Sequence, residues 1–135
     1  MLEHSGARKD DAAVWARARR IAGALSTAFF DDGLGVVIAE GEFLEQTARL
    51  EFMSMLPDDT STRFVTLTVP LDTALTRVER DPTRRISRDR DFLTRHYAEL
   101  AEALASRPDG DLRLDTSEIT LEEATRFVVR WALGK

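Results

Sequence analysis

The stretch RFVTLTVPLDTALTRVER (residues 63–80) contains the transition that decides the fold. Its first seven residues are rich in β-branched and aromatic side chains, which favour a strand, and Pro70 closes that strand. Asp72 follows at a position where it can cap a helix, and Ala74 and Val78 then recur at helical spacing. A strand that leads directly into a helix is the unit from which α/β folds with parallel sheets are built.

The rest of the chain repeats this alternation of strands and helices. An apolar run, GVVIA (residues 35–39), favours a strand covered on both faces, as in a parallel sheet. Thr120 and Glu123 stand at capping-box spacing and mark the start of the last helix. The predicted elements are helices at residues 10–32, 43–56, 89–105 and 120–133, a further helix that begins at Asp72, and strands at residues 35–39, 63–69 and 111–115. This order predicts a three-layer α/β fold, with a parallel sheet of about three strands and five helices.

The first predicted helix has a clear amphipathic pattern. Five apolar residues recur along it at steps of three or four, which places them on one face: Val14, Ala18, Ile21, Leu25 and Phe29. We expect this face to pack inward, against the sheet. Gly33 follows directly and can end the helix in a left-handed turn.

Length and composition indicate a globular chain. Its 135 residues, 43% hydrophobic and 32% charged, predict one domain over residues 10–135 after a polar tail at residues 1–9. The tail is too polar for a secretory signal, and no apolar run approaches the ~20 residues of a membrane span. Cysteine is absent, which excludes disulfides and thiol nucleophiles, while His4 and His96 are too far apart in sequence for a metal motif. We expect a cytoplasmic protein with no membrane contact and no metal-ligating residues.

The charges are unevenly distributed along the chain. A net charge of −5 argues against general affinity for nucleic acid. Residues 77–95, here called the arginine segment, nevertheless carry seven arginines: Arg77, Arg80, Arg84, Arg85, Arg88, Arg90 and Arg95. Because a guanidinium group binds phosphate through two parallel hydrogen bonds, this segment favours a phosphate-bearing small molecule as a partner. The alternative is a solvated surface on which the arginines pair with nearby acids, such as Arg77 with Asp81.

Two stretches resemble the carboxyl-terminal half of small P-loop kinases. They are VTLTVPLDTALTRVERDPTRRISRDRDFL (residues 65–93) and DLRLDTSEITLEEATRFVV (residues 111–129). The resemblance is to the shikimate kinase, gluconate kinase and chloramphenicol phosphotransferase-like group, and it extends over residues 10–133. In that group a strand ending in V-P-L leads to an arginine-bearing lid, and a last strand ends in D-T-S. The resemblance implies an ATP-dependent phosphotransferase with ATP and Mg²⁺ as cofactors.

The resemblance also implies a set of site residues. The implied catalytic residues are Arg84, Arg88 and Glu40, and the implied nucleotide contacts are Arg77, Arg80, Thr116 and Ser117. Glu40 also follows the predicted strand 35–39, and ligands of open α/β sheets bind at the carboxyl ends of strands. The alternative is that Glu40 lies in a charged loop with Glu42, and that Thr116 and Ser117 only shape the turn before the last helix.

One element of these kinases has no counterpart in the chain. They hold the phosphates of ATP in the loop G-x-x-x-x-G-K-[ST], and no stretch here fits that pattern, since the only Gly-Lys pair is Gly134-Lys135. We therefore expect a kinase-like domain without its N-terminal phosphate-binding loop, and little or no phosphotransfer by this chain alone. The alternative is a non-catalytic module that binds a nucleotide weakly or serves in dimerisation.

The resemblance carries an expectation about assembly as well. In that group the strand before the phosphate-binding loop lies between the strands that correspond to residues 35–39 and 64–69. Without it, these two strands either pair directly or each leaves an open edge. The helices at residues 10–32 and 120–133 then lack part of the sheet that they would cover. We expect a homodimer that buries some of their aromatic residues, which are Trp15, Phe29, Phe127 and Trp131.

Overall fold

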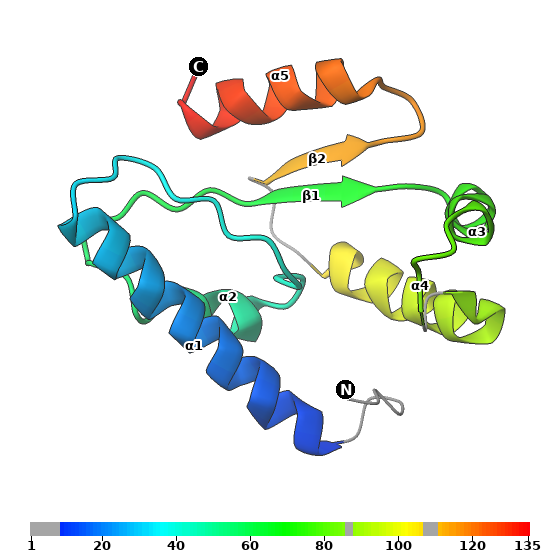
Figure 1. Cartoon of the computed structure of the whole chain (residues 1–135), viewed down its shortest axis with the longest axis horizontal. Helices are drawn as coiled ribbons and strands as arrows, with labels where there is room; N and C mark the ends of the chain where they lie inside the picture. Colours follow the sequence, from blue (N-terminus) through cyan, green and yellow to red (C-terminus); the bar gives the residue numbers. More distant parts are fainter. Residues whose placement is uncertain (1–8, 86–87, 107–110) are drawn as a thin grey trace. The chain divides into compact units, whose positions relative to one another are not determined.

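Figure 1 shows the computed structural model of the chain, in which residues 9–85, 88–106 and 111–135 are described. The chain divides into two compact units, Met1–Thr62 and Arg63–Lys135, here called the N-terminal unit and the C-terminal unit. The described residues form five helices and one sheet of two parallel strands. The prediction of a three-layer fold with a sheet of about three strands is therefore wrong. Residues 1–8 of the predicted tail, which include His4, lie outside the described residues.

The N-terminal unit consists of helices α1 (Lys9–Asp31) and α2 (Gln46–Met53) with their connecting segments. The end of α1 lies where the sequence placed it, because Gly33 takes a positive φ of 95°. The N–H of Leu34 donates to the carbonyl of Phe29 at 3.0 Å, and that of Gly33 to Phe30 at 2.9 Å. A left-handed glycine of this kind satisfies carbonyls that the last turn would otherwise leave unpaired.

The face of α1 that contacts α2 consists of small and polar residues. Gly23 and Ser26 are buried, and a Cβ placed on Gly23 would lie only 2.3 Å from the carbonyl oxygen of Phe52 on α2. Arg19 of α1 forms an ion pair with Glu51 at 2.6 Å, and the hydroxyl of Thr27 donates to the carbonyl of Met55 at 2.7 Å. The missing side chain of Gly23 therefore allows the two helices to approach closely. The ion pair of Arg19 and the hydrogen bond of Thr27 lie on either side of this contact.

The segment 35–39, predicted as a strand, forms none. Its backbone is in no strand or helix, and Val36 and Ile38 are 57% and 83% exposed. A strand exists only when a neighbouring backbone accepts and donates its hydrogen bonds, and within the described residues no strand pairs with this segment. The prediction of a buried strand at residues 35–39 is therefore wrong in both respects, because the segment is neither paired nor buried.

The C-terminal unit contains the sheet. Strands β1 (Val65–Thr68) and β2 (Leu112–Asp115) run parallel, with Val65 opposite Leu112 and Thr68 opposite Asp115 (Figure 1). Both strands lie inside their predicted ranges, and their parallel pairing is the one expected of an α/β chain. Because the strands are parallel, their carboxyl ends lie at the same edge of the sheet.

Two helices follow β1 and carry the small core of the C-terminal unit. Helix α3 (Leu71–Arg80) and helix α4 (Arg90–Ala105) bury three apolar side chains, which are Ala74, Leu75 and Leu93. Asp89 caps α4 by accepting the N–H of Phe92 at 2.9 Å. The expectation that Asp72 caps α3 is wrong by two residues, because Pro70 occupies the N-cap and Asp72 lies in the first turn.

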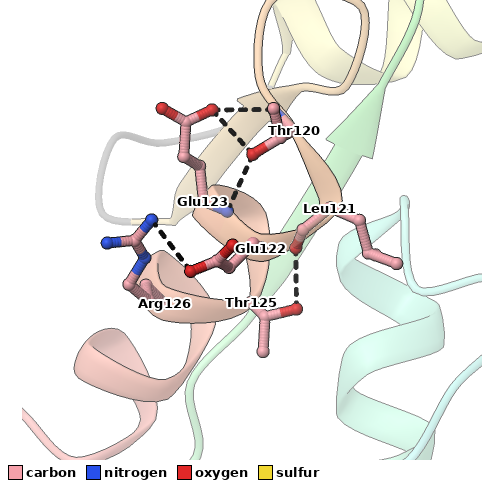
Figure 2. A network of polar contacts seen from close by, with 6 residues as sticks. All are labelled: Thr120, Leu121, Glu122, Glu123, Thr125 and Arg126. Atoms are coloured by element: carbon pink, nitrogen blue, oxygen red, sulfur yellow. Dashed lines mark hydrogen bonds and ion pairs between the residues drawn. The ribbon is translucent and has the colours of Figure 1, made fainter.

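The last helix, α5 (Leu121–Ala132), packs on β2 and begins with the predicted capping box (Figure 2). The hydroxyl oxygen of Thr120 accepts the N–H of Glu123 at 3.2 Å, and the carboxylate of Glu123 accepts the N–H of Thr120 at 2.8 Å. These bonds from Thr120 hold the pKa of Glu123 below its usual value. At the other end, Arg63 donates to the carbonyl of Trp131 at 3.0 Å and lies over its ring.

Candidate functional site

The carboxyl edge of the two-stranded sheet gathers polar side chains from four elements. Thr68 ends β1 and Asp115 ends β2, and the two residues are register partners. The loop that follows β2 contributes Thr116 and Ser117, while α3 contributes Arg77. This edge is the place at which open parallel sheets bind their ligands, because the loops there are free of the strands' hydrogen bonding. We call these five residues the sheet-edge site.

Thr116 is the centre of a hydrogen-bond network that joins the two strands to α3. Its N–H and its hydroxyl both donate to the carbonyl of Thr68, at 2.8 and 3.1 Å. Its hydroxyl oxygen and its carbonyl oxygen accept two N–H groups of Arg77, at 3.1 and 3.0 Å. Both terminal nitrogens of Arg77 therefore donate to the same residue, Thr116. These two bonds fix the plane of the guanidinium group relative to the loop after β2.

Hydrogen bonds from Ser117 hold the carboxylate of Asp115 at the end of β2. Its N–H and its hydroxyl donate to the same Asp115 oxygen at 2.8 and 2.6 Å. These two bonds, with a smaller contribution from the charge of Arg77, lower the pKa of Asp115 below its usual value. Asp115 is therefore ionised at neutral pH, and its charge lies close to that of Arg77.

Tyr97 of α4 supports the site from the apolar side. Its ring packs against the core of α3 and α4, and its hydroxyl donates to the carbonyl of Val69 at 2.9 Å, directly after β1. Burial is the largest cause that raises the pKa of Tyr97, and the charges of Arg77 and Asp115 act on it in opposite directions. Tyr97 therefore stays protonated at neutral pH and holds the end of β1 as a donor.

The sheet-edge site presents hydrogen-bond donors and an acceptor that a ligand could use. Arg77 uses only part of its five N–H donors on Thr116, so donors remain for a ligand. Asp115 supplies a charged acceptor beside them. Across the described residues, no group of three or more histidine, aspartate or glutamate side chains is placed to hold a metal ion. The site can therefore bind a polar, partly anionic ligand through hydrogen bonds.

The other arginines with expected roles lie apart from this network. Arg84 pairs with Asp81 at 3.2 Å, inside a turn in which Asp81 also accepts the N–H and the hydroxyl of Thr83. The two Thr83 bonds are the largest causes that lower the pKa of Asp81. Arg80 and Arg88 are exposed, and neither side chain bonds to a described residue. Arg77 does not pair with Asp81, the partner that the alternative interpretation assigned to it.

Glu40, the third expected catalytic residue, belongs to the N-terminal unit. It is exposed and follows the segment 35–39, which is not a strand. The reason for placing it at the carboxyl end of a strand is therefore wrong. The structure brings Arg77, Thr116 and Ser117 together within the C-terminal unit, whereas Arg80, Arg84 and Arg88 lie on exposed positions along α3 and beyond it.

The sequence analysis assigns no role to Thr68 or Asp115 of the sheet-edge site, or to Tyr97, which supports the site from α4. Asp115 ends the stretch that resembles D-T-S, and its position after a strand was the signal that could have selected it. A lone tyrosine in an amphipathic helix gives no comparable signal.

Comparison with known proteins adds no family assignment. No protein-family model matches the sequence, and neither curated proteins nor solved structures contain a match. None of the helices among the described residues combines the length and the apolar character that crossing a membrane requires.

Proposed function

We propose that the C-terminal unit binds a phosphate-bearing nucleotide at the sheet-edge site, as the nucleotide-contacting part of a kinase-like phosphotransferase. The observation that carries this proposal is the double hydrogen bond from Arg77 to Thr116 at the carboxyl ends of two parallel strands. It holds a cationic, planar donor where α/β sheets bind ligands. The resemblance of residues 65–93 and 111–129 to small P-loop kinases points to the same class of ligand.

The arginine segment supplies the second part of the proposal. Arg80 and Arg88 extend from exposed positions without partners among the described residues, and Arg84 is held by Asp81 in an exposed turn. We place these three arginines as the phosphate contacts of a lid, with Arg77 as the contact nearer the sheet. Exposed charges are screened over ~10 Å at 0.1 M salt, so their contribution should be strongest at low ionic strength.

The 135 residues do not themselves transfer phosphate in this proposal. No stretch of the sequence fits the glycine-rich loop with lysine that holds the transferred phosphate in such enzymes. Positioning of phosphate and metal supplies nearly all of the catalysis in phosphoryl transfer. We therefore expect no ATP turnover above background, and a rate near one per second, the low end for kinases, would contradict this part of the proposal.

Calorimetric titration with ATP at low salt tests the binding proposal. We expect weak binding whose dissociation constant rises by at least about fivefold in Arg77→Ala, because one cationic bidentate donor is lost. The matched control is Arg126→Ala, which removes the same charge from an exposed residue of α5 paired with Glu122. Equal weakening in both variants would show a nonspecific charge effect, and absence of binding by the unsubstituted chain would overturn the proposal.

A second candidate function is dimerisation. No described side chain is fully buried, and large apolar side chains are exposed on α1, on α5 and on the segment 34–38. A chain that folds with so little burial gains stability from an additional apolar surface. We propose a two-fold homodimer. Light scattering should give twice the 15.2 kDa of one chain at micromolar concentration, and a stable monomer would contradict it.

A further inference from the structure

Helix α1 has two different faces, and only one of them is used within the N-terminal unit. The face toward α2 contains Gly23, buried against Phe52, and Arg19, which pairs with Glu51. Thr27 reaches Met55 from the same face. These positions are small or polar, so the contact with α2 buries little of the helix's apolar surface.

The opposite face of α1 is the apolar stripe seen in the sequence. Val14, Ile21 and Leu25 are 62%, 60% and 53% exposed, and Ala18 and Ala28 between and beyond them are exposed as well. The stripe that was expected to pack against a sheet therefore exposes more than half of each of these three side chains. The reason is that α1 packs through the glycine face, which allows closer approach of its backbone to α2 than the large side chains would.

The spacing along this face fits a second helix as its partner. Ala28, in place of Phe29, continues the first four residues of the stripe, so that Val14, Ala18, Ile21, Leu25 and Ala28 are separated by steps of four, three, four and three. Steps that alternate between three and four repeat every seven residues, which is the pattern by which two helices interlock side chains along a common seam.

We propose that α1 pairs through this seam with α1 of a second copy of the chain, in antiparallel orientation, about a two-fold axis level with residue 23. In this register Ile21 of each copy lies opposite Leu25 of the other, and Ala18 lies opposite Ala28. The contacts between Ile21 and Leu25 therefore lie at the centre of the seam, and the contacts between Ala18 and Ala28 lie toward its ends. A two-fold axis makes each of these contacts twice.

Charge determines the antiparallel choice. Arg17 and Asp31 both flank the seam on the same side, fourteen residues apart, which is two heptads. In the antiparallel register Arg17 of each copy approaches Asp31 of the other, and the other flank brings Trp15 to Phe29. In a parallel pair Arg17 would face Ala22, and no oppositely charged pair would form along the described helix. Opposite charges beside an apolar seam select orientation.

This inference deepens the dimerisation candidate and does not depend on nucleotide binding. Sedimentation equilibrium of the full chain and of Ile21→Lys combined with Leu25→Lys tests the seam. We expect the dimer dissociation constant to rise at least about tenfold, because two charges per copy enter the apolar contact. The matched control is Leu50→Lys, a change of the same kind at an exposed apolar residue of α2, which should leave the constant unchanged.

The sedimentation results distinguish a failure of the dimerisation candidate from a failure of the proposed seam. If the unsubstituted chain is monomeric, the dimerisation candidate fails and the seam with it. If the chain is a dimer that the seam variant leaves intact, dimerisation stands and the seam is rejected. Helix content measured by circular dichroism should be equal in all three proteins, because each substituted residue is more than half exposed.

Two further measurements test the orientation. Arg17→Asp should weaken the dimer, Asp31→Arg should weaken it as well, and the two changes in one chain should restore it. Because the sequence has no cysteine, introduced cysteines report contact unambiguously. An equal mixture of Ala18→Cys and Ala28→Cys should form a disulfide under mild oxidation. Ala18→Cys alone should not, since its two copies would lie about 15 Å apart along the axis. Cross-linking of Ala18→Cys with itself would overturn the antiparallel arrangement.

Discussion

The two apolar runs of the chain, GVVIA at residues 35–39 and VTLT at residues 65–68, have opposite outcomes. The first is the more hydrophobic, yet it forms no strand and exposes Val36 and Ile38. The second alternates apolar residues with threonine, and it forms β1 because β2 lies beside it. The difference shows that composition sets a preference for extended backbone, whereas a partner strand decides whether a sheet forms.

The same contrast holds for the helices of the two units. In the C-terminal unit α3 and α4 bury Leu75 and Leu93 against each other. In the N-terminal unit α1 turns its glycine face to α2 and leaves its large side chains exposed. The C-terminal unit therefore satisfies its apolar residues internally to a greater extent, and the N-terminal unit depends more on a surface outside itself.

The largest expected effect on stability comes from the small core between α3 and α4 of the C-terminal unit. Leu75→Ala should lower the free energy of unfolding by about 3 kcal/mol, because a buried side chain is removed and its neighbours close the space only in part. Urea unfolding followed by the amide signals of residues 63–135 measures it. Leu121→Ala, at an exposed residue of α5, is the control and should change stability by less than about 0.5 kcal/mol. Equal losses would show that Leu75 is not part of a core.

A smaller loss is expected when the close helix contact of the N-terminal unit is blocked. Gly23→Ala places a Cβ against the carbonyl oxygen of Phe52, so α1 and α2 must separate, at about 2 kcal/mol. Gly35→Ala is the matched control, because a Cβ there meets nothing within 4 Å. Hydrogen exchange of the α1 and α2 amides should accelerate in the first variant alone. Unchanged exchange in Gly23→Ala would mean that the two helices are not packed as described.

The capping box of α5 tests a local feature of the C-terminal unit. Thr120→Ala removes the side chain that accepts the Glu123 N–H, and it should cost about 1 kcal/mol. Thr125→Ala makes the same change in the middle of α5, where the hydroxyl only donates back to Leu121, and should be close to neutral. Thermal unfolding of both variants gives the comparison. A larger loss in Thr125→Ala would show that the cap does not anchor the helix.

The smallest expected effect concerns the acidic end of β2. The pKa of Asp115 is lowered in the folded chain, so its carboxylate stabilises the fold above its unfolded pKa of about 4, and this contribution is lost as the pH falls through the folded pKa. The stability difference between the unsubstituted chain and Asp115→Asn should therefore shrink on acidification. Titration of the Asp115 carboxyl carbon by NMR should show its pKa rising in Ser117→Ala. A pKa that Ser117→Ala leaves unchanged would show that Ser117 does not hold the carboxylate.

Local signals predicted much of the fold. The capping box and the glycine end of α1 were readable because each depends on neighbours a few residues away. The ranges of the two strands followed from their composition, although their pairing joins distant parts of the chain. The segment 35–39 and the inward face of α1 were predicted wrongly, since both depend on distant parts of a folded protein. At the candidate site, Arg77, Thr116 and Ser117 came from a resemblance, whereas Tyr97 joins them only through the packing of α4 against the chain after β1.

The most direct measurement of the central claim is a map of amide chemical shifts as ATP is added at low salt. If the nucleotide binds at the sheet-edge site, the largest shifts fall on the end of β1, on Arg77 and on Thr116 and Ser117, and in Arg77→Ala they need at least about fivefold more ATP to reach the same size. Shifts centred on Glu40 and the segment 35–39, or shifts whose dependence on ATP Arg77→Ala leaves unchanged, would contradict the account.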